Sequence, residues 1–147
     1  MPIIVFIRDS QYGMPIAQSV HLVGLTMLLA TVLVVNLRLA GVALKDSSLD
    51  WLVQQLRPWM IGGLVVAVLS GALIFIGTPA KYLASNPFRV KMATLALAML
   101  FQYFTLRRFA APDSPPRSRA VSLVVAALSL TLWFTVGWAG RAIAFIP

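Results

Sequence analysis

The feature that most constrains this chain is a long apolar run, Met14–Leu39, which also carries the only histidine of the sequence, His21. Roughly twenty apolar residues, rising about 1.5 Å each in a helix, cross a hydrocarbon layer of about 30 Å. Three further apolar runs follow, at Trp59–Gly77, Val90–Leu106 and Ala120–Ile146. The first run lacks a cationic leader and a small-residue cleavage site, so we expect it to be a retained membrane helix.

The composition supports a membrane protein. Apolar residues make up 60% of the 147 residues and charged residues only 11%, which excludes an ordinary soluble domain. Runs of this length favour helices over barrel strands, which need only about ten alternating residues. We therefore predict an all-α chain, a four-helix transmembrane bundle forming one integral membrane domain over 1–147. Its helices are expected at about 14–39, 59–77, 87–107 and 120–146.

Local signals set the expected helix ends. Residues before the first run are expected to lie along the membrane interface as a short tail. A short amphipathic helix is expected from Leu49, with Pro58 opening the second membrane helix because a proline lacks only an N–H that the first turn leaves unpaired. Asn86 is expected to cap the third helix. Gly63 and Gly71 belong to a small-residue seam that favours close helix packing.

The charge pattern indicates orientation. The net charge of +8 comes from basic residues at helix ends and connectors, so we expect a lipid bilayer and no nucleic acid as partner. The first and third connectors with their flanks hold seven basic residues and the opposite side holds five. The richer side is expected to be cytoplasmic, which places both termini on the periplasmic side.

Three basic side chains are expected at one level of the bundle. His21 lies about 9 Å along the first helix, and Lys91 lies about 6 Å along the third, which starts from the same side. Arg141 lies about 9 Å before the end of the fourth helix, which leaves on that side. Arg89 lies just above them. The chain has no glutamate and only four aspartates, and buried cations without carboxylates are costly unless an anion joins them.

These residues predict a bound anionic guest. A haem fits, with His21 as the iron ligand and Arg141, Arg89 or Lys91 paired with its propionates; a phospholipid phosphate or a quinone head would also offset the charge. Gly24, one turn from His21, would leave room for a flat cofactor. The absence of cysteine excludes thiolate metal sites and covalently attached c-type haem. The plainer alternative is that His21 only hydrogen-bonds a neighbouring helix, while the cations reach the membrane surface.

Three stretches carry a family resemblance: SVHLVGLTMLLATVLVVNLRLAG, SGALIFIGTPAKYLASNPFRVKM and SLTLWFTVGWAGRAIAF. With these the chain resembles a family of four-helix bacterial membrane proteins related to the CopD-like membrane domain. It is more distantly similar to the HemJ-type protoporphyrinogen oxidases, small four-helix haem-b proteins. That similarity implies His21 and Lys91 as the haem-site pair and the bacterial cytoplasmic (inner) membrane as location. Asn36 departs from the HemJ-type pattern, because those proteins usually have aspartate at this position.

The leading hypothesis is therefore a haem-b-binding membrane protein of electron transfer or porphyrin oxidation, and a haem-dependent oxidoreductase if it is an enzyme. The alternative is a non-catalytic accessory subunit of a larger membrane complex. The protein partners to expect are further copies of the chain in a homo-oligomer or the subunits of such a complex. Metal or solute movement, which the CopD-like resemblance suggests, has little support because one histidine without cysteine is a poor copper path.

Overall fold

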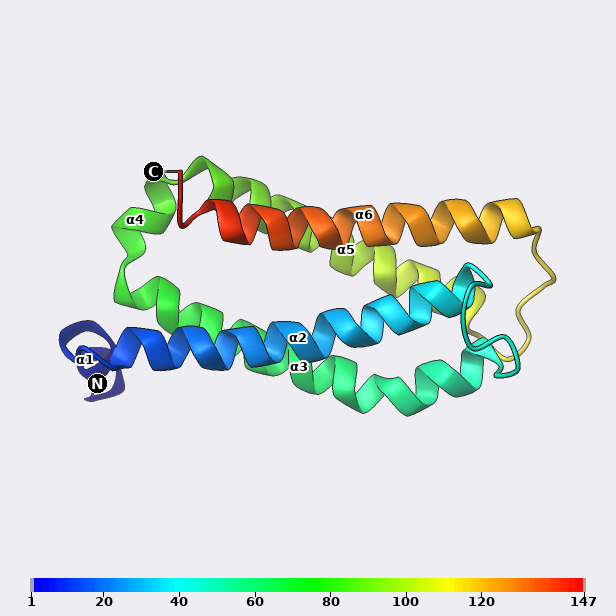
Figure 1. Cartoon of the computed structure of the whole chain (residues 1–147), viewed down its shortest axis with the longest axis horizontal. Helices are drawn as coiled ribbons and strands as arrows, with labels where there is room; N and C mark the ends of the chain where they lie inside the picture. The colour runs from blue at the N-terminus through cyan, green and yellow to red at the C-terminus, as the bar shows by residue number, and fades with distance from the viewer. Residues whose placement is uncertain (1, 147) are drawn as a thin grey trace.

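The computed structural model describes residues 2–146, and that part of the chain contains helices and connectors but no β-strand. Figure 1 shows two antiparallel helix pairs, α2 beside α3 and α5 beside α6, and the main contact between the pairs is made by α2 and α6. The chain is thus two helical hairpins joined along one helix of each. In order, the helices are α1 (Pro2–Asp9), α2 (Gly13–Leu39), α3 (Leu49–Gly77), α4 (Pro79–Ala84), α5 (Asn86–Phe109) and α6 (Arg119–Ala142).

The all-α class is confirmed, but the number of helices is not. The described residues form six helices in place of the predicted four, because the tail before Gly13 folds as α1 and the connector before α5 folds as α4. Three helices, α2, α3 and α6, are long and apolar enough to cross a membrane. The fourth expected span, α5, is long enough but is not among them, since it carries Arg89 and Lys91 at one end and Arg107 and Arg108 at the other.

The second helix of the first hairpin, α3, is continuous. We expected a separate amphipathic helix ending before Pro58, but α3 runs from Leu49 to Gly77 with Pro58 inside it. Ser48 caps this helix, because its hydroxyl oxygen accepts a hydrogen bond from the Trp51 amide at 3.2 Å. A proline inside a helix removes one backbone hydrogen bond and bends the axis, and Figure 1 shows α3 bending partway along its course.

Two other helix ends differ from expectation. The cap of α5 is Ser85, whose hydroxyl accepts from the Phe88 amide at 3.4 Å, while Asn86 is already inside the helix. The helix α6 ends at Ala142 and continues only as turns, so it is shorter than the predicted 120–146. The end of α2 follows the sequence: Gly41 has φ +71, the left-handed conformation that suits a glycine after a helix.

Glycines set the spacing inside the first hairpin. A Cβ added to Gly24 of α2 would lie 2.6 Å from the Ala67 nitrogen, and one added to Gly63 of α3 would lie 2.7 Å from the Leu28 nitrogen. No side chain fits at either position, so α2 and α3 cross with their backbones in contact. The predicted small-residue seam therefore packs against another helix of the same chain, α2.

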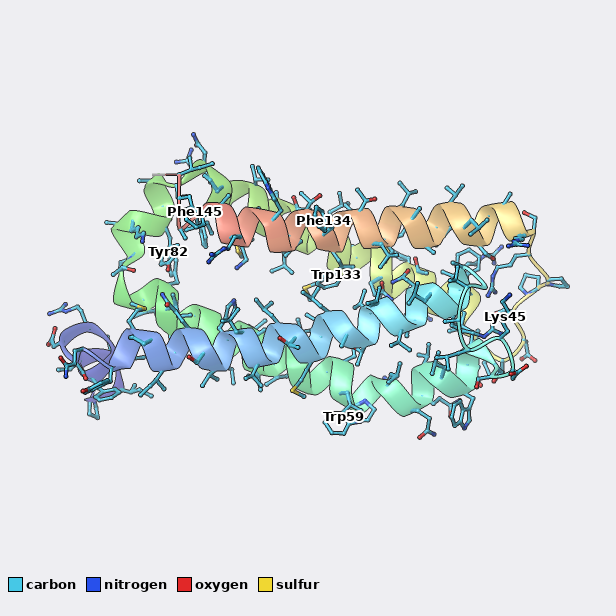
Figure 2. All side chains as sticks on the ribbon, viewed as in Figure 1. Lys45, Trp59, Tyr82, Trp133, Phe134 and Phe145 are labelled. Atoms are coloured by element: carbon cyan, nitrogen blue, oxygen red, sulfur yellow. The ribbon has the colours of Figure 1, made fainter. Side chains whose placement is uncertain are left out.

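Apolar side chains pack where the two hairpins meet. One cluster joins Leu28 and Val32 of α2 with Trp133 of α6, and a second joins Val35 of α2 with Ala126 of α6. Figure 2 shows Trp133 between the hairpins and Trp59 on the outside of α3. Many large apolar side chains of the long helices point outward, as expected for helices in contact with lipid.

Candidate functional site

His21 is held against α3 by two hydrogen-bonding contacts. Its Nδ1 lies 2.8 Å from the carbonyl oxygen of Ala67 and 3.1 Å from the hydroxyl oxygen of Ser70. The ring lies so close to α3 that a Cβ on Gly71 would be only 3.1 Å from His21 Cε1. The small-residue seam of α3 therefore provides the space for the imidazole.

These contacts assign the tautomer of the imidazole. The Ala67 carbonyl can only accept, and the Ser70 hydroxyl donates its proton to the Val66 carbonyl. Nδ1 must then carry the hydrogen and donate it to Ala67. Among residues 2–146 no protein group is hydrogen-bonded to Nε2, so in the neutral ring the lone pair on Nε2 remains available. Histidines that bind metals commonly donate the other ring N–H to a backbone carbonyl in this way.

Lys91 comes from the second hairpin to the same end of the molecule. Its side chain runs along α6, where a Cβ on Gly140 would lie 3.4 Å from Nζ and 3.5 Å from Cε. The side chain is partly buried. A base near the start of α2 and a cation near the start of α5 therefore lie at the same end of the molecule (Figure 1).

Within residues 2–146, neither His21 nor Lys91 forms an ion pair with an acidic side chain. The single ion pair within residues 2–146 joins Arg8 to Asp9, at 3.2 Å, and both of its side chains are exposed. No group of three or more histidine, cysteine or acidic residues in the described chain is placed to hold a bare metal ion. The site has a nitrogen ligand and a cation, and its chemistry suits an anionic ligand better than a free cation.

The other sequence-predicted site residues lie elsewhere. Arg141 is exposed and its guanidinium stacks 4.9 Å from the centre of the Phe145 ring. Arg89 is exposed and donates to the Leu83 carbonyl at 3.2 Å. The space beside Gly24 is filled by the backbone of α3, so the contacts of this glycine are those of helix packing.

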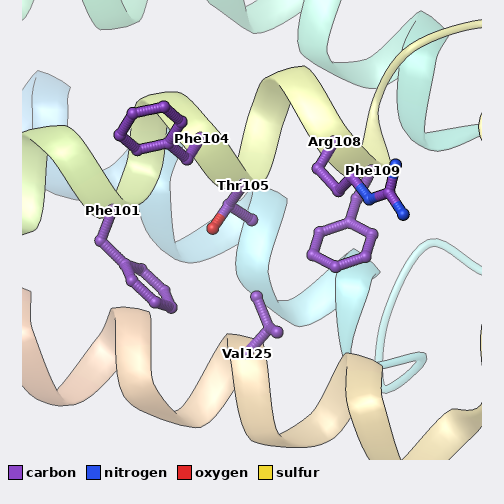
Figure 3. Close-up of a pocket in the computed structure, with 6 residues that line it drawn as sticks. All are labelled: Phe101, Phe104, Thr105, Arg108, Phe109 and Val125. Carbon is purple, nitrogen blue, oxygen red and sulfur yellow. The ribbon is translucent and has the colours of Figure 1, made fainter.

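Two grooves mark the surface between helices, and neither includes His21 or Lys91. The larger, of about 610 Å³, lies between α2 and α6 and extends from Leu33 to Arg141. The smaller, of about 250 Å³, lies between α5 and α6, where Figure 3 shows Phe101, Phe109 and Val125 around it with Arg108 at one side. Both grooves are lined mainly by apolar side chains.

Comparison with known proteins places the chain in a family. A protein-family model described as a family of unknown function, DUF6644, matches residues 6–146. The chain belongs to the DUF6644 family. The comparisons with curated proteins and with solved structures gave no match.

The matched region of this DUF6644 protein includes basic residues at the opposite end of the bundle. Arg38 at the end of α2 donates to the Ser47 carbonyl at 2.6 Å, and Arg117 donates to the Ser122 hydroxyl at 2.9 Å. Partial burial of Arg117, reinforced by the positive charge of Arg38, lowers the pKa of the Arg117 guanidinium. These two arginines tie connectors to helix ends.

Sequence reasoning missed a second polar group of this DUF6644 protein, in the middle of the bundle. Asn36, Gln102 and Ser129 are buried, and the Ser129 hydroxyl donates to Gln102 Oε1 at 2.8 Å. The available signal was the position of each residue inside an otherwise apolar helix, where polar side chains are rare and turn toward other helices.

Proposed function

We propose that this DUF6644 protein is a four-span integral membrane protein of the bacterial inner membrane that binds haem b at His21. The membrane part rests first on α2, α3 and α6, which have the length and composition of spanning helices. We include α5 as the fourth span because it runs antiparallel beside α6 (Figure 1) and its charged residues sit near its two ends. Positive-inside counting then favours termini on the periplasmic side, and α1 and the C-terminal end of α6 lie at the same end of the molecule.

The observation that carries the haem proposal is the fixed His21 ring. Donation from Nδ1 to Ala67 leaves Nε2 as the ring atom that can bind iron, and the 2.8 Å contact holds the ring in one orientation. A bare metal ion would need several protein ligands, and only one histidine is present. A haem brings four of its own nitrogen ligands and needs only one or two from the protein.

Lys91 supplies the second part of the site. Its ammonium lies in the same region without a carboxylate partner, so a haem propionate, or the iron as a second ligand, would be a suitable partner. Arg141 and Arg89 are the further candidates for propionates, and their exposed guanidinium groups reach the site only by turning away from Phe145 and Leu83. Lys91 is therefore the primary partner in this proposal.

A bound haem would supply one-electron chemistry, with its potential set by the axial ligand and by burial. The chain's own residues would fix the ring plane of His21, supply positive charge through Lys91 and exclude water along the α2–α3 contact. We propose electron transfer or porphyrin oxidation as the activity that this arrangement serves. A phospholipid or a quinone head is the other anionic or polar guest that the same residues could hold.

The test is an absorption spectrum of the full chain, purified in detergent after expression with ample haem and again after addition of hemin. We expect a Soret band with stoichiometric haem, and its loss in His21→Ala at unchanged protein yield. Ser19→Ala is the matched control, since Ser19 is exposed on the same helix and bonds only the Pro15 carbonyl.

Two results would overturn the proposal. One is a wild-type protein without a Soret band in the presence of excess hemin, and the other is a band that His21→Ala leaves unchanged. Mass spectrometry of the organic extract then shows whether a phospholipid or a quinone is bound in place of haem. A Lys91→Gln variant with lowered haem content and an unchanged ligand-field spectrum would assign Lys91 to a propionate, whereas a changed ligand-field spectrum would assign it to iron.

A further inference from the structure

The middle of the bundle holds a polar layer separate from His21. Asn36 of α2 and Ser129 of α6 have 0% exposure, and Gln102 of α5 has 4%. Each comes from a different helix, and two of them are joined by the 2.8 Å hydrogen bond from Ser129 to Gln102. Polar groups buried this completely are costly unless every donor and acceptor is paired.

Three atoms around this layer have no hydrogen-bond partner within residues 2–146: Asn36 Oδ1, Gln102 Nε2 and Trp133 Nε1. One is an acceptor and two are donors. The assignment of Asn36 is fixed chemically, because its Nδ2 donates to the Val32 carbonyl at 2.8 Å and that carbonyl cannot donate in return. Leaving such a group unpaired when it is buried is energetically costly.

The packing places the three residues in the same part of the interface between the two hairpins. The helices α2 and α6 run antiparallel (Figure 1), and Val32 packs in one cluster with Trp133 while Val35 packs in another with Ala126. Asn36 follows Val35 and therefore lies near the level of Ala126, about one helical turn from Ser129, which bonds Gln102. Trp133 is one turn further along α6, and helical side chains tilt toward the N-terminus of their helix, here toward Ser129.

We propose that this layer is an internal water-binding site that joins the two hairpins. The occupant must donate to Asn36 Oδ1 and accept from Gln102 Nε2 or Trp133 Nε1. Water does both and is small enough for a packed interior, and buried waters typically make about three such bonds. A cation cannot accept from the two donors, and a carboxylate cannot donate to Asn36.

The site would link the hairpins by hydrogen bonds. Asn36 belongs to the first hairpin, whereas Gln102 and Trp133 belong to the second, and the α2–α6 contact is the main one between them. A bound water then adds directional bonds to an interface otherwise built from apolar contacts. A direct hydrogen bond from Gln102 to Asn36 is the competing arrangement, and it would leave the layer dry.

The experiment is solid-state NMR of the ¹⁵N-labelled full chain in bilayers of deuterated lipid, measuring magnetisation transfer from water to side-chain N–H groups. We expect a water cross-peak at the Trp133 indole, assigned by its loss in Trp133→Phe. Lipid in the bilayer centre excludes water, so the peak reports an internal site. Asn36→Leu is expected to remove the cross-peak while the indole resonance itself remains.

Thr31→Val is the matched control, because the Thr31 hydroxyl is also buried on α2 but already bonds the Leu28 carbonyl at 2.7 Å. It is expected to leave the cross-peak unchanged. A wild-type protein with no water transfer to either the Trp133 indole or the Gln102 side-chain amide would overturn the proposal, as would a cross-peak that survives in folded Asn36→Leu. If Asn36→Leu does not fold, the wild-type spectrum decides alone, since a direct correlation between the Gln102 and Asn36 side chains would show the dry arrangement.

Discussion

Replacement of Gly63 by alanine should destabilise the first hairpin, and the neighbouring Gly62 provides a matched comparison. A Cβ at Gly63 would lie 2.7 Å from the Leu28 nitrogen, 2.9 Å from the Gly24 oxygen and 3.0 Å from Met27 Cβ. A Cβ at Gly62 would meet only the flexible end of Met27, at 3.9 Å. The two substitutions are chemically identical and one residue apart, so they differ only in which side of α3 they occupy.

The expected magnitude follows from these distances. Ordinary contact begins near 3.4 Å, so α2 must move about 0.7 Å away from Leu28 to accept the methyl group of Gly63→Ala. Backbone atoms cannot rotate aside as side chains do, and overpacking of this kind typically costs about 1–3 kcal/mol. Alanine also gains up to about 1 kcal/mol over glycine in a helix. We expect a net loss of about 1–2 kcal/mol for Gly63→Ala and no loss for Gly62→Ala.

The assay is unfolding of the purified protein in mixed micelles of rising SDS fraction, followed by tryptophan fluorescence. The midpoint should fall for Gly63→Ala and stay or rise for Gly62→Ala. Equal midpoints for the two variants would refute the close backbone crossing of α2 and α3. Equal midpoints would also count against the contact between His21 and the Ala67 carbonyl, because that contact depends on the close crossing of α2 and α3.

Two further variants test single contacts. Ser85→Ala should lower the free energy of unfolding by about 1 kcal/mol, and with it the SDS midpoint, because it removes the cap that accepts from the Phe88 amide. An unchanged midpoint would show that α5 is not capped there. Gly140→Val should displace the Lys91 side chain that lies 3.4 Å from its Cβ position and lower haem content, measured by the Soret band. Gly137→Val is its control, since nothing lies within 4 Å of that position, and equal haem content in both variants would contradict the placement of Lys91.

Helix content was predictable from the chain because it depends on local signals. Apolar runs of spanning length predicted α2, α3, α5 and α6 to within a few residues at most ends. Pro58 favours a helix start, because a proline is tolerated in the first turn of a helix. The structure instead shows α3 continuing through Pro58. That choice depends on the packing of both halves of α3 against α2, and packing between distant segments leaves no local signal in the sequence.

The position of each residue along the bundle axis could also be predicted from the sequence, but the direction in which its side chain points from the helix could not. Each residue adds about 1.5 Å along a helix, and this uniform rise places His21, Lys91 and Arg141 near the same end. Each residue also turns the side chain by about 100°, since a turn contains 3.6 residues. Gly140 faces Lys91, and Arg141, the next residue, points outward to Phe145.

The same geometry explains why His21 and Lys91 pack between helices while two arginines point outward. His21 and Lys91 each face a glycine, Gly71 or Gly140, which leaves room for a polar side chain between helices. Arg89 and Arg141 have exposed side chains near helix ends, where a long cationic side chain can reach water or headgroups. A polar residue within a span is thus informative when a small residue of the neighbouring helix lies opposite it. That pairing depends on helix rotation, which the order of residues within a single helix does not specify.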